Sequence, residues 1–504
     1  MRKNLIKIVS IIVLALSLNS CYKDLGNYDY NWIDRVVVYG MGDKYSVMRG
    51  DSLKIAMEVY ASKTTTEELT ELGEGYSYAW IALTNSYLIP NPIADTISRE
   101  KDLGKEISLN KGEYVLEFVV RDNINNLEWK YKSALSVTLS ILEGWLFMEK
   151  DAQGYADLDI LSRNTDGEYR MYNHMLSSTT LTKEQRGGAR SVCFLNGQLN
   201  KGKGIWFLTD NITGYLDVET GHLFDKKQVI GNFMTEQTPD NYTIKKMIQL
   251  PLNNVFVFTD NNDMRFSTQA ILLLSDELCY YRGEKFDISP VVGATFAFTA
   301  SQFLCYDNTN KRFLLFRSNY NWTTLPNLPK GKELINMSSL GASMSETAYA
   351  LLKDDAGMYE IVLNPNDGSV VSPMKLMGSG PNLMNAEFYA YHQSSYVLYY
   401  SHQSKLFVNR SGVETPVSLT TSEGKSINLE GEITCLFTRN FGNTHIYPHL
   451  IEYLNYLVVA TKLPDGTGKV YFLTPEYGNA HKMTVTRETP TPNPIISIDY
   501  QTNF

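Results

Sequence analysis

The chain has 504 residues, of which 43% are hydrophobic and 20% charged, and this balance is typical of a folded protein rather than a disordered one. Its formal net charge is −9 and no basic stripe offsets it, which argues against nucleic acid as a partner. A chain of this length is expected to form two or more domains, or one large closed β-structure.

The N-terminus has the features of a secretory signal peptide. A basic start precedes the apolar run IVSIIVLALSL at residues 8–18, which is shorter than the roughly 20 residues needed to span a bilayer. The sequence Leu-Asn-Ser-Cys at residues 18–21 follows, and it resembles the bacterial lipobox, whose cysteine carries the lipid. We therefore expect a signal peptide at 1–20, lipidation at Cys21 and a tether at 21–35. The alternative is an ordinary signal peptide with an incidental cysteine.

The residues after Cys21 bear on the location of the protein. Lys23 and Asp24 resemble the charged export signals of surface lipoproteins of Bacteroidetes. More than one acyl chain gives stable membrane anchoring. We expect a lipid-anchored protein of the outer membrane that faces the cell exterior and contacts the membrane only through its lipid.

The remaining cysteines occur in apolar, strand-like runs without CxxC spacing. This pattern predicts four buried thiols, at Cys193, Cys279, Cys305 and Cys435. An oxidising compartment would also permit one disulfide, and its connectivity cannot be read from the sequence.

Residues 36–141 predict an immunoglobulin-like β-sandwich. Runs such as DSLKIAMEVYA and YSYAWIAL alternate apolar and polar residues with a period of two, as half-buried strands do. About a hundred residues with some seven strands are typical of this fold. We expect Trp80 to be a core residue and the run GEYVLEFVVRD to pack opposite it.

Residues 142–504 predict a β-propeller. Strand–turn–strand units recur there, and their turns centre near residues 166, 218, 262, 308, 366, 403 and 466. The average step of about 50 residues is close to the repeat of known propellers. Seven turns predict seven blades, with ISIDYQ at the C-terminus supplying the strand that closes the ring. A second set of β-sandwiches is the alternative, because it also gives evenly spaced hairpins.

The layout as a whole resembles a known family. The decapeptide CYKDLGNYDY after the lipobox, the sandwich, and the EGWL entry into the second block look like the PKD-like lipoproteins of Bacteroidetes. These are usually encoded beside SusC/SusD-type nutrient importers. The resemblance implies a surface lipoprotein that serves the uptake of glycans or peptides, and it supplies no catalytic motif.

Motifs for catalysis or cofactor binding do not stand out, so we predict no catalytic residue, no metal and no cofactor. His445 and His449 lie four apart in HIYPH, but two ligands without a third are weak evidence for a metal site. The acidic stretches TDNND and LPDGTG are predicted to be hairpin turns. A pair of carboxylates for glycoside hydrolysis can be neither identified nor excluded among 55 acids.

Aromatic residues in turn-rich stretches are the candidates for ligand binding. RSNYNWTTLPN places Tyr320 and Trp322 near Arg317, and FGNTHIYPH contains Tyr447. A flat ring can stack on a sugar face or hold a peptide side chain, while a polar group fixes the orientation.

The sequence therefore predicts an accessory protein of a SusC/SusD-type importer that captures or docks nutrient oligomers without covalent chemistry. The ligand would be an oligosaccharide or an oligopeptide, and the partners would be the importer proteins. Two alternatives remain open: a propeller-type glycoside hydrolase or lyase, and a purely structural importer subunit.

Overall fold

The computed structural model describes residues 35–501, except for 63–67, 85–93, 110, 139–142, 164–166, 180, 196–203, 218–222, 225–243, 250–254, 268–276, 295–301, 342–345 and 440–449. These residues are almost entirely β-structure. They divide into two compact units, one made of residues up to 45, 54–105 and 115–134, the other of 46–53, 106–114 and 135–504. In the described part of the chain, every helix is too short or too polar to cross a bilayer.

The first ten strands form the predicted sandwich. They make a three-stranded sheet (β1-β4-β5), a five-stranded sheet (β2-β10-β9-β6-β7) and a two-stranded sheet (β3-β8). Their bounds are β1 Arg35–Tyr39, β2 Lys44–Met48, β3 Ser52–Ile55, β4 Glu58–Ser62, β5 Leu69–Glu71, β6 Tyr76–Thr84, β7 Ala94–Ser98, β8 Leu103–Glu106, β9 Gly112–Asp122 and β10 Leu127–Thr138.

Trp80 is a core residue, as predicted. It is fully buried, and its ring centroid lies 4.7 Å from that of Phe118 on β9. Its indole N–H donates to the carbonyl of Lys101. The expectation that the β9 run packs opposite Trp80 is wrong in one respect, because β9 lies beside β6 in the same sheet.

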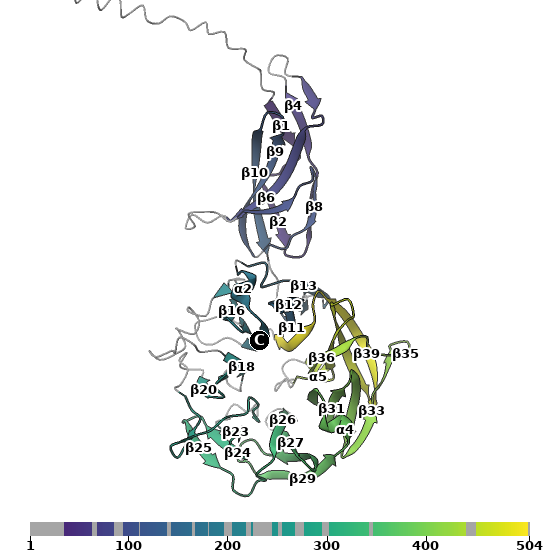
Figure 1. Ribbon diagram of the computed structural model, residues 1–504. Helices are drawn as coiled ribbons and strands as arrows, with labels where there is room; N and C mark the ends of the chain where they lie inside the picture. Colours follow the sequence, from purple (N-terminus) through teal and green to yellow (C-terminus); the bar gives the residue numbers. More distant parts are fainter. Residues whose placement is uncertain are drawn as a thin grey trace, which may run out of the picture. The chain divides into compact units, whose positions relative to one another are not determined.

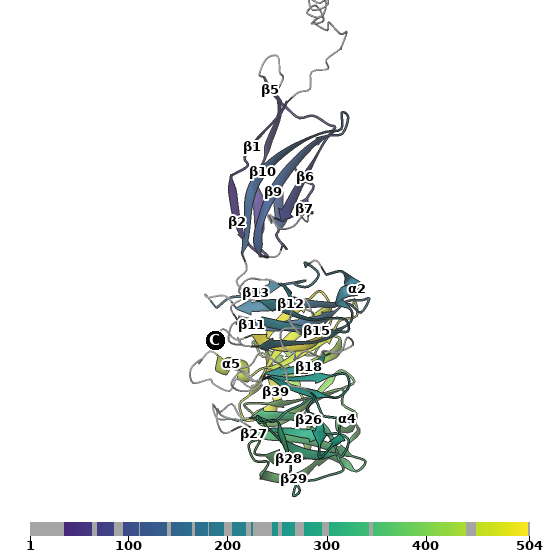
Figure 2. The same ribbon diagram turned by 90° about the vertical axis from the view of Figure 1, so that its left-hand side faces the viewer.

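The strands from Glu143 onward form seven sheets of three or more strands, together with the hairpin β21-β22. Figure 1 shows these sheets arranged around a ring, and Figure 2 shows the same sheets from the side. The first sheet contains β11 Glu143–Lys150, β12 Ala156–Arg163, β13 Tyr169–Tyr172 and β40 Ile495–Gln501. The second contains β14 Ala189–Leu195, β15 Gly204–Thr209, β16 Thr213–Asp217 and β17 Leu223–Phe224. The third contains β18 Ile244–Gln249, β19 Val255–Thr259 and β20 Met264–Ser267.

The ring continues through the hairpin, four further sheets and three short helices. The bounds are β21 Tyr280–Tyr281, β22 Glu284–Lys285, β23 Gln302–Asp307, β24 Arg312–Arg317, β25 Asn321–Thr324, β26 Glu333–Leu340, β27 Thr347–Asp354, β28 Gly357–Leu363, β29 Val370–Gly378, β30 Phe388–His392, β31 Val397–His402, β32 Lys405–Arg410, β33 Val413–Pro416, β34 Ser418–Thr421, β35 Ser426–Ile427, β36 Glu432–Phe437, β37 Leu457–Lys462, β38 Gly468–Glu476 and β39 Asn479–Thr491. The helices are α2 Lys183–Arg186, α4 Pro381–Met384 and α5 Leu450–Leu454.

Each sheet of this ring packs against the next through a buried apolar cluster. Leu146 and Phe207, for example, share one cluster between the first and second sheets. Further clusters join the second sheet to the third and so on around the ring, and the last one joins β37 and β38 back to β11 and β40. A single sheet of this kind cannot bury both of its faces alone, so stacking in a ring stabilises all of them. This arrangement is a β-propeller.

The C-terminal strand closes the ring, as the ISIDYQ run predicts. β40 pairs antiparallel with β11, with Trp145 opposite Tyr500 and Phe147 opposite Ile498. The first and last strands of the propeller thus share one sheet. The number of seven blades stays a prediction, since two of the described sheets have three strands rather than four.

The four cysteines of the propeller are buried free thiols, which confirms that expectation. Burial raises the pKa of each thiol, so none of them has the character of a reactive thiolate.

Candidate functional site

Three of the predicted ligand-binding residues lie close together on β24, β25 and the turn between them. Arg317 ends β24 and pairs with Asn321, the first residue of β25, while Trp322 pairs with Phe316. Tyr320 occupies the turn between them, with a φ of 65°. The fourth residue, Tyr447, lies outside the described residues, as do Cys21 and the histidine pair of HIYPH.

Trp322 and Tyr320 differ in how much of each ring is available. The Trp322 ring packs edge-on against Phe286 and tilted against Phe316, and its N–H donates to the carbonyl of Leu278 at 2.6 Å. Tyr320 is 45% exposed, and its ring centroid lies 5.9 Å from that of Phe266 in an edge-to-face arrangement. Ligand binding at these positions stays a prediction. Tyr320 is the stronger candidate of the two, because the indole of Trp322 packs against Phe286 and Phe316 and its N–H already has a hydrogen-bond acceptor.

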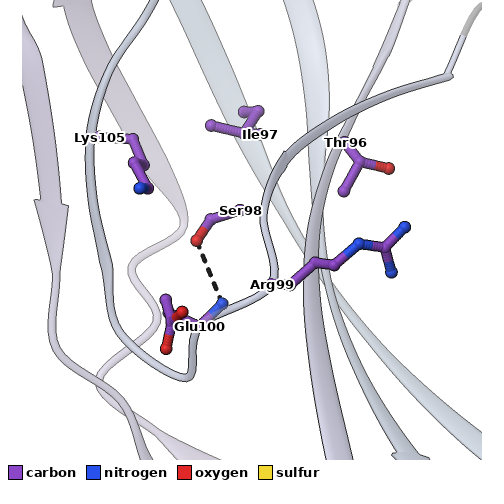
Figure 3. Close-up of a pocket in the computed structure, with 6 residues that line it drawn as sticks. All are labelled: Thr96, Ile97, Ser98, Arg99, Glu100 and Lys105. Atoms are coloured by element: carbon purple, nitrogen blue, oxygen red, sulfur yellow. Dashed lines mark hydrogen bonds between the residues drawn. The ribbon is translucent and has the colours of Figure 1, made fainter.

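The sandwich carries a hollow of about 410 Å³ beside β7 and the following turn. Figure 3 shows its lining, which is Thr96, Ile97, Ser98, Arg99, Glu100 and Lys105. The backbone N–H of Glu100 donates to the Ser98 hydroxyl, and the charged side chains are exposed. The hollow has no aromatic platform and little apolar surface, so it resembles a solvated sheet edge more than a ligand pocket.

A cluster of ionisable groups that the sequence did not suggest lies on the sheet that closes the propeller. Glu149 comes from β11, Asp159 from β12, and His174 from the segment after β13. One oxygen of each carboxylate and one ring nitrogen of His174 all lie within 4.8 Å of one another. We call these three residues the closure cluster.

The two acids of the closure cluster are 0% exposed, whereas the side chain of His174 is 50% exposed. Glu149 Oε2 accepts from the side-chain amide of Asn493 at 3.2 Å, and Asp159 Oδ1 accepts from the backbone N–H of His174 at 2.7 Å. Glu149 Oε1 and Asp159 Oδ2 have no hydrogen-bond donor in the structure.

The electrostatics of the closure cluster follow from its burial. Burial and then the neighbouring Asp159 raise the pKa of Glu149, and burial also raises the pKa of Asp159. Two buried carboxylates this close together both stay ionised only beside a cation; otherwise a proton neutralises one of them.

Asp157 flanks the closure cluster and behaves differently. Its burial disfavours the ionised form, yet hydrogen bonds from His174, Ser177 and Leu158 hold its pKa below the ordinary value. Its Oδ2 lies 3.4 Å from His174 Nδ1 and also 3.4 Å from Nη1 of Arg186. Asp157 is therefore a compensated carboxylate that orients the imidazole.

A glycosidase would also need carboxylates with a raised pKa, but those of the closure cluster are fully buried. A polymer chain cannot bring a glycosidic bond between side chains that are 0% exposed. The arrangement is suited to holding a small cation or a proton. The only hint in the sequence is the spacing of Asp157 and Asp159 in ADLDIL, which places both on one face of a strand.

The outer rim of the propeller carries an exposed apolar surface. It combines four residues of β29 with one of the adjacent strand β33, namely Val370, Val371, Met374, Leu376 and Val413, which are 38% to 65% exposed. We call it the rim patch. β29 is the last strand of its four-stranded sheet, and both of its faces reach solvent over most of its length.

The comparison with sequence families supports the prediction of a PKD-like domain in the N-terminal part of the chain. Residues 21–187 match the model of the PKD-like family. The match spans the predicted tether, the sandwich and the first strands of the propeller. No curated protein matches the chain in sequence.

Solved structures with a similar arrangement share little sequence with this chain. A quinonprotein alcohol dehydrogenase-like protein from Bacteroides thetaiotaomicron is 13% identical, with 92% of this chain and 97% of that chain covered and a TM-score of 0.48. The Dos1 propeller is 13% identical over 68% of this chain and 80% of its own, with a TM-score of 0.38. YCF48 bound to D1 peptide is 10% identical over 64% and 87%, with a TM-score of 0.36. We draw no functional conclusion from similarities this distant.

Proposed function

We propose that this protein is a lipid-anchored accessory of a SusC/SusD-type importer at the outer surface of the outer membrane. The lipobox-like Leu-Asn-Ser-Cys at residues 18–21 supports the anchor, and the PKD-like sandwich followed by a propeller supports the resemblance to importer-associated lipoproteins. Its role is to capture or dock nutrient oligomers, glycan or peptide, without covalent chemistry.

The rim patch is the observation that carries the docking part of the proposal. Consecutive exposed valines, Val370 and Val371, lie on an edge strand whose outer backbone groups are open to a partner. Exposed apolar residues gathered on one strand edge mark an interaction surface more often than isolated ones do. Importer proteins of the same membrane are the occupants we assign to it, because the lipid would hold the propeller beside them.

Capture of a ligand would use the exposed aromatic and cationic side chains of the β24–β25 turn. Tyr320 offers a ring that reaches solvent, and the exposed Arg317 lies three residues before it, where its carbonyl accepts from the Tyr320 backbone N–H. A purely structural subunit is the second candidate. The rim patch supports a structural subunit as much as it supports a subunit that captures ligand. The two candidate functions differ only in whether Tyr320 contributes to ligand binding.

The test is a pull-down from detergent-solubilised outer membranes with the lipidated protein as bait. Recovery of a stoichiometric SusC/SusD-type pair is the expected result. Val371→Lys and Leu376→Lys place charges in the rim patch and should abolish recovery, while their exposure leaves folding intact. Tyr477→Lys is the matched control, since Tyr477 is fully exposed on the β38–β39 turn and outside the patch. Recovery of the bait alone, or equal recovery by the rim variants, would contradict the proposal.

A further inference from the structure

We infer that Glu149, Asp159 and His174 form a binding site for a divalent transition-metal cation. This site is separate from the rim patch and from the β24–β25 turn, and it does not depend on the proposed importer role. It joins β11, β12 and the segment after β13 at the point where the propeller closes.

The first argument is the pair of oxygens without donors. Glu149 Oε1 and Asp159 Oδ2 are fully buried and accept no hydrogen bond from a donor group, and one oxygen of each acid lies within 4.8 Å of the other acid. The nearby guanidinium of Arg186 contacts Asp157 and the carbonyl of Ala156 instead. Leaving two buried carboxylate oxygens without a donor is energetically unfavourable. A cation between them removes that cost.

The second argument is the presence of an imidazole, that of His174, beside the two carboxylates. A proton shared by two carboxylates would need no further ligand, yet a ring nitrogen of His174 lies within the same 4.8 Å. His174 also adopts a φ of 58°, and its backbone N–H is held by the Asp159 carboxylate, so the main chain fixes the position of the imidazole. The half-exposed ring gives the ion a route from solvent.

The third argument is that each ligand has a partner that orients it. Asn493 holds Glu149, the His174 N–H holds Asp159, and Asp157 lies against His174 Nδ1. Outer hydrogen bonds of this kind accompany metal ligands in proteins and set their orientation.

The ligand set selects the class of metal. Ca²⁺ and Mg²⁺ prefer sites made of oxygen, whereas imidazole suits zinc and its neighbours in the periodic table. Two carboxylates and one imidazole fit Zn²⁺ or Mn²⁺, with water completing the coordination on the side of His174. Because Asn493 lies just before β40, the ion would tie the start of the propeller to its end.

The experiment measures the metal bound by the full chain, purified with a tag that lacks histidine. The protein is stripped with a chelator, dialysed against Zn²⁺, Mn²⁺ or Ca²⁺, and analysed by mass spectrometry of the elements. We expect about one equivalent of Zn²⁺ or Mn²⁺ and no comparable uptake of Ca²⁺. Failure of the wild type to retain any of the three metals would overturn the site without touching the importer proposal.

Variants then assign the bound ion to the closure cluster. Glu149→Gln and His174→Ala should each weaken binding by roughly tenfold or more. Glu149 is buried, so its variant could fold poorly. The test therefore depends on His174→Ala, because half of the His174 side chain is exposed to solvent. Asp465→Asn and His481→Ala are the matched controls, one on the exposed β37–β38 turn and the other on β39. Equal binding by His174→Ala and its control would reject the assignment.

A shared proton gives a different set of results. In that case the wild type retains no metal, and Glu149→Gln is at least as stable as the wild type in urea, because an amide can donate to Asp159 where a protonated carboxyl did. Under the metal-site assignment, the wild type loses thermal stability on chelation and His174→Ala does not respond to the chelator.

Discussion

At the scale of single residues, His392 shows how a buried imidazole couples folding to pH. It is fully buried at the end of β30, where Nε2 lies 3.0 Å from the carbonyl of Asn455 and Nδ1 lies 2.9 Å from the hydroxyl of Ser395. A carbonyl only accepts, so Nε2 carries the proton and Nδ1 accepts from Ser395. Burial lowers the pKa of His392 to about 4.

We predict that this histidine destabilises the fold in mild acid. Its pKa is lower in the folded state than the 6.5 of the unfolded chain, so its contribution is intact above pH 6.5 and is lost as the pH falls toward 4. The loss should reach about 2–3 kcal/mol near pH 4.5. Urea unfolding at pH 7 and pH 4.5 measures it.

The matched variants isolate this effect from the titration of other groups. His392→Gln should lower stability at pH 7 but reduce the difference between the two pH values, because an amide does not titrate. His481→Gln, on β39, should keep the wild-type difference. An unchanged difference in His392→Gln would show that the ring is not the group responsible.

At the scale of elements, the sheet that closes the ring depends on one aromatic group. Trp145 on β11 is 1% exposed, and five rings surround it, those of Phe437, Tyr453, Tyr456, Phe472 and Tyr500. The hydroxyl of Tyr500 donates to Glu143 Oε1 at 2.8 Å, across the two ends of the propeller. The sequence run EGWL thus supplies the residue around which aromatic side chains of β36, β38, β40 and the α5 segment assemble.

We predict that Trp145→Ala destabilises the protein by about 3–5 kcal/mol, the cost of removing a large buried aromatic side chain. Trp145→Phe should cost less because it fills part of the space. Equilibrium unfolding in urea gives both values. Tyr477→Ala, which removes a fully exposed ring, should change stability by less than about 0.5 kcal/mol. A small effect of Trp145→Ala would mean that β40 does not hold the ring closed.

The same scale explains why the repeat in the sequence was irregular. The turn near residue 308 joins the first two strands of its sheet, those near 262 and 403 join the second and third, and the one near 366 joins the third and fourth. The turn near 466 joins β37 and β38, two inner strands of a six-stranded sheet. Asn, Asp and Gly are suited to any tight hairpin, so the pattern marks hairpins without giving their place in the sheet. The spacing of the turns therefore predicted a propeller, but the turns fall between different pairs of strands from one sheet to the next.

At the scale of the whole molecule, the proposed function requires attachment through Cys21. We predict that Cys21→Ser moves the protein from the membrane fraction to the soluble fraction and abolishes incorporation of labelled palmitate, because the proposed function assigns the membrane anchor to acyl chains on Cys21. Asn27→Ala, within the predicted tether, should leave both unchanged. Continued membrane attachment of Cys21→Ser would point to a protein partner or another segment as the anchor.

The sequence by itself determined the features that depend on near neighbours along the chain. Alternation of apolar and polar residues predicts strands, turn residues predict hairpins, and the lipobox-like run is a linear signal. The family match over residues 21–187 and the closing role of ISIDYQ agree with those predictions. Buried cysteines were predictable for the same reason, since each lies in an apolar run: Cys193, Cys305 and Cys435 are on strands, and Cys279 lies just before β21.

Only the tertiary structure decided which side chains meet. In the sequence Trp322 and Tyr320 look alike, but pairing of Trp322 with Phe316 directs its ring toward the core while Tyr320 stays exposed. The closure cluster combines Glu149, Asp159 and His174 with Asn493, which lies 344 residues from Glu149. Contacts over such separations depend on strand register and ring closure, and no local pattern of residue types encodes either one.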